Sequence, residues 1–487
     1  MGRSGKALLI ALLIGVCLAL GFFLPSGQVE RGSIEATGKP NIVFILTDDL
    51  DLASVSKIPA LDAYMADEGV TFDNAFVTES LCCPSRASIL TGQYPHNHLI
   101  RTNTPPLGGF ETFRNLKRER STVATWLDAA GYETALFGKY LNGYDKRKRV
   151  YVPPGWDEWY GFVGEEELNQ NGHVVDYPAS TYLDDALSGL AQDFVRRQED
   201  EDAPFFLYLS VHAPHVPAEP DRRHRNLFNG LQAPRTSSFD EADLSDKPDW
   251  VRAPPLDYEK RKHIDEIYRN RLRTMTAVGE MVGGLLRTLE DTRQLDDTYI
   301  IFTSDNGYHM GQHRLQLGKE SAYEEDIRIP LMVRGPGVPA GVERDEMVLN
   351  NDFAPTFASL AGLPPTDEVD GRSFAPLLDR KEQNDPASWR TAFEISHWAA
   401  RPEGESLYEV VTPVPAYRAV RTQRYLYVEY GDKQHELYDL EKDPYELRNL
   451  YDSANETLIS KLDSRLDALR DCKGEECRTA ENTQPPP

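Results

Sequence analysis

Two pairs of polar side chains in the sequence could together hold a metal ion. Asp48 and Asp49 directly follow one apolar run, and Asp305 and Asn306 directly follow another. Carboxylate and amide oxygens favour a hard cation such as Ca²⁺ or Mg²⁺, and these pairs contain no soft ligand that would recruit zinc or copper. Because turns and helix caps also account for many Asp pairs, the pattern needs support from the rest of the chain.

A second candidate for chemistry is the adjacent pair Cys82 and Cys83, because neighbouring cysteines rarely bond each other. The pair stands in Ser80-Leu-Cys-Cys-Pro-Ser-Arg-Ala-Ser-Ile-Leu-Thr-Gly92, where Cys-x-Pro-Ser-Arg is followed by the apolar start of a helix. A buried structural thiol is the simplest interpretation of a cysteine taken alone. The motif around Cys82 is what favours a functional residue.

The elements that must position these residues indicate an α/β fold. Three short, continuous apolar runs are typical of strands buried on both faces of a parallel sheet. Strands that alternate with helices imply a large, mostly parallel central sheet covered by helices on both faces. Ligand sites in such folds gather at the carboxyl ends of strands, where Asp48, His215 and Asp305 stand. The predicted strands are residues 41–47, 205–210 and 298–304, and the predicted helices are residues 121–130 and 272–292.

The composition and residue pattern change along the chain and divide it into segments. A catalytic domain is predicted for residues 40–377. A smaller C-terminal α+β domain is predicted for residues 378–470, where alternating, aromatic-rich residues indicate an antiparallel sheet and a helix follows at 456–469. The charged stretch 236–262 is predicted to be a surface loop, and the tail 471–487 is predicted to be disordered.

The N-terminus predicts export from the cytoplasm. Arg3 and Lys6 precede an apolar run from Ala7 to Leu24, which fits a secretory signal and is also just long enough for an uncleaved membrane anchor. Residues 1–27 are therefore predicted to be a signal peptide or an N-terminal membrane anchor, followed by a polar linker at residues 28–39. Both alternatives make the protein secreted or otherwise extracytoplasmic.

The remaining cysteines agree with an oxidising compartment. Cys472 and Cys477 could close a small disulfide loop, and a metal site there is less favoured because no further Cys or His lies nearby in the sequence. Cys17 belongs to the targeting segment. Asn455-Glu-Thr matches a glycosylation acceptor, although an ordinary exposed asparagine is the simpler interpretation.

The formal net charge of −25 argues against a nucleic-acid binder that works through a broad basic face. It does not exclude an anionic substrate, because a metal and a few cations can reverse the field inside one pocket. It does favour an exo-acting enzyme, which takes one terminal residue, over a protein that grips long polyanions.

The stretch from Cys82 to Gly92 resembles the signature of the type I sulfatases, in which a formylglycine-generating enzyme oxidises the first cysteine of the motif to formylglycine. That cysteine is Cys82 here, and Cys83 takes the variable position. The resemblance covers roughly residues 40 to 470 and implies an alkaline-phosphatase-like fold and no nucleotide or redox cofactor. It also implies a site for Ca²⁺, with Mg²⁺ as the alternative, whose ligands would be Asp48, Asp49, Cys82, Asp305 and Asn306.

The resemblance further implies roles for four side chains. Lys139 and Lys319 would contact the sulfate, His215 would protonate the departing alcohol, and Arg86 would support the formylglycine. One hydroxyl of the hydrated aldehyde would attack sulfur, and expulsion of sulfate would re-form the aldehyde. A serine could not complete this cycle, because it would become a stable sulfate ester.

The chain departs from the family pattern at Leu141. Many members read Gly-Lys-x-His, with a histidine that acts on the formylglycine diol, whereas this chain reads Gly138-Lys-Tyr-Leu-Asn142. That form resembles the N-acetylglucosamine-6-sulfatase branch and implies a sulfated sugar substrate, such as a 6-O-sulfated N-acetylglucosamine residue. Asn142, His212 or His309 could replace the histidine, and the sequence does not choose between them.

Two other functions stay open at this point. A phosphodiesterase or phosphatase of the same superfamily would use Ser or Thr, or two metals with more Asp and His ligands, and the intact Cys-x-Pro-Ser-Arg argues against it. A non-catalytic carbohydrate-binding protein of the same fold would be marked by a lost ligand or cysteine, and only Leu141 points that way.

His313 could lie in a pocket or on the surface.

Overall fold

The structure, a computed structural model, describes residues 38–145, 149–164, 166–364, 366, 368–379, 389–399 and 413–483. The segment 1–27, predicted to be a signal peptide or anchor, and most of the predicted linker lie outside the described residues. None of the helices in the described ranges combines the length and the apolar character that a membrane span requires.

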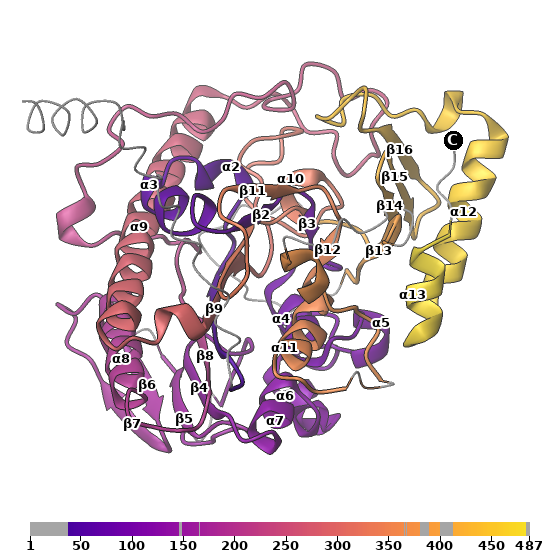
Figure 1. Ribbon diagram of the computed structural model, residues 1–487. Helices are drawn as coiled ribbons and strands as arrows, with labels where there is room; N and C mark the ends of the chain where they lie inside the picture. The colour runs from indigo at the N-terminus through magenta and orange to yellow at the C-terminus, as the bar shows by residue number, and fades with distance from the viewer. Residues whose placement is uncertain are drawn as a thin grey trace, which may run out of the picture. The chain divides into compact units, whose positions relative to one another are not determined.

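A ten-stranded sheet lies at the centre of the described residues, in the order β11-β2-β10-β9-β1-β8-β4-β5-β6-β7 (Figure 1). The strands from β9 to β5 in this order pair in parallel, whereas β10, β6 and β7 run antiparallel to their neighbours. The predicted α/β fold with a mostly parallel central sheet is therefore confirmed, and antiparallel strands extend the sheet on both sides. The strands are β1 (Asn41–Thr47), β2 (Val70–Phe72), β4 (Glu133–Gly138), β5 (Glu158–Phe162), β6 (Glu167–Gln170), β7 (His173–Asp176), β8 (Phe205–Ser210), β9 (Thr298–Ser304), β10 (Leu331–Arg334) and β11 (Val342–Arg344).

Strand β1 shows why the inner strands carry unbroken apolar runs. Successive side chains of a strand point to opposite faces of the sheet. Ile42, Phe44 and Leu46 accordingly join the apolar cluster on one face, and Val43 and Ile45 join the cluster on the other. All five side chains are fully buried, so a polar residue at any of these positions would lie in the core.

Helices cover both faces of the sheet (Figure 1). Helices α8 and α9 pack on the face of Val43, and α4, α7 and α11 pack on the face of Phe44. The helices of two turns or more are α4 (Cys82–Thr91), α6 (Gly109–Asn115), α7 (Val123–Ala129), α8 (Leu183–Arg197), α9 (Tyr258–Asp291), α11 (Phe353–Leu360), α12 (Glu456–Arg470) and α13 (Glu475–Glu481). The short elements are α2 (Leu52–Val55), α3 (Pro59–Leu61), η1 (Asp62–Ala66), α5 (Pro95–His98), η2 (Arg118–Arg120), η3 (Arg222–His224), η4 (Leu295–Asp297), α10 (Glu324–Ile327), η5 (Asn350–Asp352), η6 (Ala375–Leu378), η8 (Tyr451–Ser453) and the strand pair β3 (Ala75–Phe76) and β12 (Val348–Leu349).

The stretch 236–262, predicted to be a surface loop, differs from that prediction in two ways. Helix α9 begins at Tyr258, where the Asp257 side chain caps it by accepting a 2.9 Å hydrogen bond from the main-chain N–H of Lys260. Its first turns are mostly exposed, so their sequence lacks the apolar spacing that marks the rest of the helix. Upstream of the helix, Glu241 and Lys247 are buried rather than exposed.

The C-terminal region holds an antiparallel sheet, as predicted, in the order β13 (Ala392–His397), β14 (Tyr417–Thr422), β15 (Tyr425–Tyr430) and β16 (His435–Asp439). The prediction of a disordered tail at 471–487 is wrong for the described part, because α13 forms there. A disulfide joins Cys472 to Cys477 at its start, and Glu481 at its end is buried and paired with Arg390 over 2.9 Å. The disulfide is the small loop that the sequence predicts, whereas the pairing of Glu481 with Arg390 joins residues far apart in the chain and cannot be inferred from the local sequence.

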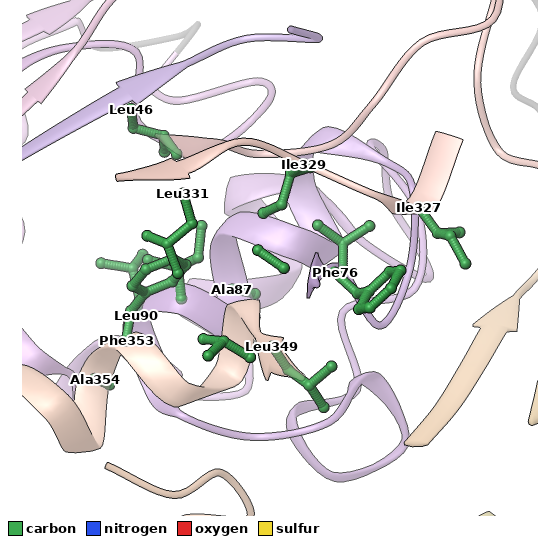
Figure 2. Close-up of a cluster of buried hydrophobic side chains, with 14 of the residues drawn as sticks. Leu46, Phe76, Ala87, Leu90, Ile327, Ile329, Leu331, Leu349, Phe353 and Ala354 are labelled. Atoms are coloured by element: carbon green, nitrogen blue, oxygen red, sulfur yellow. The ribbon is translucent and has the colours of Figure 1, made fainter. Parts of the chain in front are cut away.

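An apolar cluster fixes helix α4, which begins with Cys82, between the sheet and α11. Figure 2 shows Ala87 and Leu90 of α4 among Leu331 of β10 and Phe353 of α11. All ten residues of α4 are buried. The Cys-x-Pro-Ser-Arg motif therefore lies on a helix that the core holds from several sides, and the position of its first residue is set by that packing.

Candidate active site

Four neighbouring strands deliver the polar residues to one edge of the sheet. Asp48 follows β1, Lys139 follows β4, Asp305 follows β9, and the loop after β8 carries His215. The pairing of β1 with β9 and of β8 with β4 is parallel and in register, so these strands end together. The carboxyl ends of parallel strands are where α/β proteins bind ligands.

Cys82 lies at this edge with its sulfur among charged groups. The sulfur is 3.3 Å from Oδ1 of Asp48, 3.8 Å from Oδ1 of Asp49 and 2.8 Å from Nζ of Lys319. Burial, and next the Asp48 carboxylate, raise the pKa of the Cys82 thiol well above its ordinary value. An unmodified Cys82 would thus be a neutral thiol and a poor nucleophile.

Arg86, one helical turn after Cys82, ties the motif to the strand ends. Its Nε donates to Oδ2 of Asp305 over 2.7 Å, and its Nη1 donates to the Lys139 main-chain oxygen over 2.9 Å and to the Ser210 hydroxyl over 2.7 Å. The side chain is fully buried. Three of its N–H groups are thus held by neighbours, so the guanidinium is fixed in place rather than mobile.

The two lysines pair with the first two aspartates. Lys139 binds the Asp48 carboxylate, and Lys319 binds the Asp49 carboxylate. Burial works against the charged form of both acids, but the lysine ammonium groups hold the pKa of Asp48 well below and that of Asp49 below the usual range. Both carboxylates are therefore ionised and able to act as ligands.

The donor set fits a hard divalent cation. One ligand atom each from Asp48, Asp49, Cys82 and Asp305 lie within 4.8 Å of one another. Oδ2 of Asp49 and Oδ1 of Asn306 are buried and have no hydrogen-bond partner among the described residues, as expected of oxygens that a cation would bind. Asp49 also adopts a left-handed conformation with φ 67°, a strain that is typical of functional positions.

Two histidines border the site on its solvent side. Nε2 of His215 lies 3.6 Å from Oδ2 of Asp49, and Nε2 of His212 lies 3.9 Å from Oδ2 of Asp48. The His215 side chain is 21% exposed and that of His212 is 49% exposed, whereas both aspartates are fully buried. A substrate would therefore meet the histidines at the entrance and the carboxylates at the base.

The other two candidates to replace the missing histidine, His309 and Asn142, have different surroundings, and Oδ1 of Asn142 is buried with no hydrogen-bond partner among the described residues. Nδ1 of His309 lies 2.9 Å from Asp326, and its main chain pairs with that of Gly318, directly before Lys319. The main-chain oxygen of Asn142 accepts a 2.9 Å hydrogen bond from Phe110. His309 thus braces the Lys319 loop, and of the three candidates His212 is the one whose ring lies beside Asp48.

Arg271 of α9 is a site residue that the sequence analysis missed. Its side chain is fully buried, and its guanidinium donates to the main-chain oxygens of Asp49 and Pro214 and pairs with Asp51 over 3.1 Å. It therefore links the loop of Asp49 with the loop that carries His215. A signal was present, since Arg271 directly precedes the predicted helix 272–292 and stands four residues before the apolar Met275, in line with the apolar face, where a charged residue needs a partner.

Comparison with known proteins identifies the family. The family model described as Sulfatase matches residues 40–363, and the one described as N-sulphoglucosamine sulphohydrolase, C-terminal, matches residues 311–472. The first covers the residues at the strand ends, the motif and both lysines. The second overlaps it and continues through the antiparallel sheet, so together they span most of the described chain.

Individual proteins give the same result. The N-acetylglucosamine-6-sulfatase of Capra hircus is 33% identical over 92% of this chain and 86% of its own length, and that of Homo sapiens is 32% identical over 97% and 90%. A solved structure described as a complex with its substrate D-glucosamine-2-N,6-O-disulfate aligns with a TM-score of 0.74 and 25% identity over 92% of this chain and all of that one. The resemblance inferred from the motif is confirmed: the chain belongs to the sulfatase family and is a sulfuric ester hydrolase.

Proposed function

We propose that this sulfatase hydrolyses sulfate monoesters through a hydrated formylglycine made from Cys82. The observation that carries the proposal is the environment of the Cys82 sulfur, 3.3 Å from Asp48 and 2.8 Å from Lys319. That sulfur stands in for the oxygens of the modified residue, which would meet the same carboxylates and ammonium group. The hydrated aldehyde supplies two hydroxyls on one carbon, one to attack sulfur and one to release sulfate.

Asp48, Asp49, Asp305 and Asn306 would hold a divalent cation, Ca²⁺ or Mg²⁺, beside the modified residue. Oδ2 of Asp49 and Oδ1 of Asn306 support this set, because both oxygens are buried and neither has a hydrogen-bond partner among the described residues. Such a cation supplies Lewis-acid stabilisation of negative charge on oxygen. It would also compete with Lys139 and Lys319 for the aspartates and so turn both ammonium groups toward the sulfate.

Lys139 and Lys319 would bind the sulfate oxygens and stabilise the charge that develops on the transferring group. They approach the Cys82 position from different segments, one after β4 and one after His309. Both lie in a largely buried site, where fixed charges act more strongly than in water. Arg86 would keep the modified residue and Asp305 in register, because it contacts both strand ends.

His215 would protonate the departing alcohol. Its Nδ1 donates a 2.6 Å hydrogen bond to the Val216 main-chain oxygen, since a carbonyl can only accept. Nε2 is therefore the nitrogen that can deliver a proton from the doubly protonated ring, and it faces Asp49. The partly exposed position of the ring suits contact with a bound ester and exchange of protons with solvent.

A sulfated sugar, such as a 6-O-sulfated N-acetylglucosamine residue at a chain end, is the substrate that we propose. The named relatives and the Gly-Lys-Tyr-Leu-Asn form around Leu141 support this choice. Exo action agrees with the formal charge of −25, which repels long polyanions. Export, with maturation by a formylglycine-generating enzyme, agrees with the predicted N-terminal signal and with the extracellular sulfatase homologue of Drosophila melanogaster, which is 36% identical over 76% of this chain.

The first test is a mass spectrum of the tryptic peptide from Ile58 to Arg86, from protein made in a host that matures sulfatases. We expect the aldehyde or its hydrate at Cys82 in the wild type and in Cys83→Ala, and full loss of N-acetylglucosamine-6-sulfate hydrolysis in Cys82→Ala. An unmodified, active Cys82 would overturn the mechanism. Hydrolysis of phosphate monoesters or diesters in preference to sulfate esters would favour the phosphatase alternative.

A further inference from the structure

Away from the active site, three side chains from separate segments converge on one buried point. His313 lies in the loop after β9, Glu325 lies in α10, and Glu446 lies in the loop after β16. One ligand atom from each lies within 4.8 Å of the other two, which is the same spacing that groups Asp48 with Asp305 at the active site. His313 and Glu446 are each 1% exposed.

Each of the three side chains has one atom without a hydrogen-bond partner in the described part of the chain. These atoms are Nε2 of His313, Oε2 of Glu325 and Oε1 of Glu446, and all three are buried. Their other polar atoms are occupied: Oε1 of Glu325 accepts from Ser238 over 3.1 Å, and Oε2 of Glu446 accepts from the Glu324 N–H over 3.1 Å. Buried polar atoms are rarely left unpaired, so this group calls for a ligand.

The second nitrogen of His313 determines what kind of ligand that is. Nδ1 lies 2.6 Å from Oε2 of Glu241, and a stacked Tyr323 ring, 4.1 Å away between centroids, fixes the imidazole plane. A proton on Nδ1 satisfies Glu241 and leaves the Nε2 lone pair directed away from it. This arrangement of carboxylate, histidine and open nitrogen is how proteins orient a histidine that binds a metal.

The types of side chain in the group also favour a cation. Glu241, Glu325 and Glu446 bring three carboxyl groups to this place, and Lys247 is the nearby ammonium. Nζ of Lys247 is engaged by the Tyr438 hydroxyl over 2.8 Å and by the main-chain oxygen of Glu446. One imidazole nitrogen and two carboxylate oxygens form a donor set suited to zinc and related transition metals rather than to Ca²⁺.

We propose that His313, Glu325 and Glu446 bind a zinc ion, or a related divalent transition metal, with Glu241 orienting the histidine. The site joins the segment that carries Lys319 to the loop after β16, so the ion cross-links the C-terminal sheet region to the catalytic loop. Its role is structural, and it is separate from the cation proposed for Asp48 and Asp49. The proposal does not depend on the chemistry of Cys82.

The test uses the full chain without a histidine tag, stripped by a chelator and then saturated with Ca²⁺ to fill the active site. Isothermal titration with Zn²⁺ alone is expected to show one tight site per chain, and metal analysis after gel filtration is expected to show one retained zinc. Titration with Co²⁺ is expected to give an absorption band from nitrogen and oxygen ligands. A wild type that retains no zinc overturns the proposal without any variant.

Variants locate the site. His313→Gln and Glu446→Gln are expected to abolish tight Zn²⁺ binding, and Glu241→Gln to weaken it about 10–100-fold through the histidine. Glu441→Gln is the matched control, because Glu441 is exposed and is not one of the proposed ligands. It should bind Zn²⁺ as the wild type does. Zinc bound equally by all four variants would mean adventitious binding and would refute the site. Circular dichroism of each variant checks that it is folded.

Discussion

The ammonium nitrogen of Lys319 lies 2.8 Å from the sulfur of Cys82 and also contacts the carboxylate of Asp49. Three segments that are far apart in the sequence thus meet at one positive charge. The loop of Lys319 is held by the main-chain pairing of Gly318 with His309, whose ring is in turn held by Asp326. The lysine is therefore placed by a braced loop, which suits a charge that must be fixed before substrate arrives.

Removal of this charge tests its contribution to catalysis. Lys319→Ala is expected to lower kcat/KM about 10²–10³-fold, the range found when a preorganised charge-stabilising donor is lost. Lys319→Arg should retain part of the activity, since it keeps the charge but not the compact geometry. Initial rates on an aryl sulfate and on N-acetylglucosamine-6-sulfate measure both. Lys57→Ala, at an exposed position, is the control. If Lys319→Ala has the same kcat/KM as Lys57→Ala, Lys319 does not stabilise the charge on the transferring group.

Metal removal tests the cation site of the proposed mechanism. A chelator is expected to abolish sulfate ester hydrolysis, and Ca²⁺ or Mg²⁺ to restore it. The cation should also stabilise the fold, by about 2.7 kcal/mol at a concentration one hundred times its Kd, which a thermal shift measures. Asn306→Ala removes a buried oxygen that has no hydrogen-bond partner among the described residues, so it should lower the affinity for the cation about tenfold or more. Activity that survives complete chelation would contradict the site.

The sequence predicted the residues of the candidate site better than the contacts that hold those residues in position. Asp48, Asp305 and the Cys82 motif follow local patterns, namely the ends of apolar runs and a short signature, and such patterns are visible without a structure. The contact of Lys319 with Cys82 depends on loop closure across the fold, so spacing alone could not show it. The resemblance to a family supplied that residue.

The errors have a physical cause in common. The stretch of helix α13 is predicted to be disordered because it belongs to a chain terminus that ends in three prolines, yet the helix is stabilised by the burial of Glu481 against Arg390, 91 residues away in the chain. Lys247 was expected in a surface loop, yet it is buried against Tyr438. Charged residues predict exposure only when they lack a distant partner, and the sequence does not show where the partner lies.

Arg271 gives a prediction about a positioning residue. Arg271→Met is expected to lower kcat about 10–100-fold with a smaller change in KM, because it frees the main chain of Asp49 and Pro214 without removing a group that touches substrate. Arg271→Lys should recover little, since one ammonium cannot reach three acceptors at once. The measurement is a full rate profile against substrate concentration. A purely structural role would lower the amount of folded enzyme and leave kcat per folded molecule unchanged.

The loss of Arg271 should also affect stability. It leaves Asp51 as a buried carboxylate without its ion pair, which typically costs about 3–5 kcal/mol of unfolding free energy. Arg273→Met is the control, because Arg273 lies on the same helix with its contacts at the surface. Equal denaturation midpoints for both variants would contradict the contribution assigned to the buried guanidinium.

Asp184, at the start of α8, gives a prediction about pH. Burial raises the pKa of its carboxyl group from 3.8 to about 6. The folded state binds this proton more tightly than the unfolded state does. Below pH 4 the group is protonated in both states, so burying it costs no ionisation free energy. As the pH rises through 6 the buried group ionises, and stability falls by up to about 3 kcal/mol. Asp184→Asn keeps a hydrogen-bond acceptor but cannot ionise, so its gain in stability should be absent at pH 4 and complete above pH 7.

Urea denaturation at several pH values between 4 and 8 measures this gain, with Asp193→Asn as the control because Asp193 on the same helix is 65% exposed in its side chain. A stability difference that is the same at every pH would mean that packing, not ionisation, separates Asp184→Asn from the wild type. Since the carboxyl group lies beside the main chain of His212, the same variant should leave the fold around the entrance of the active site intact while shifting only the pH range over which the enzyme stays folded.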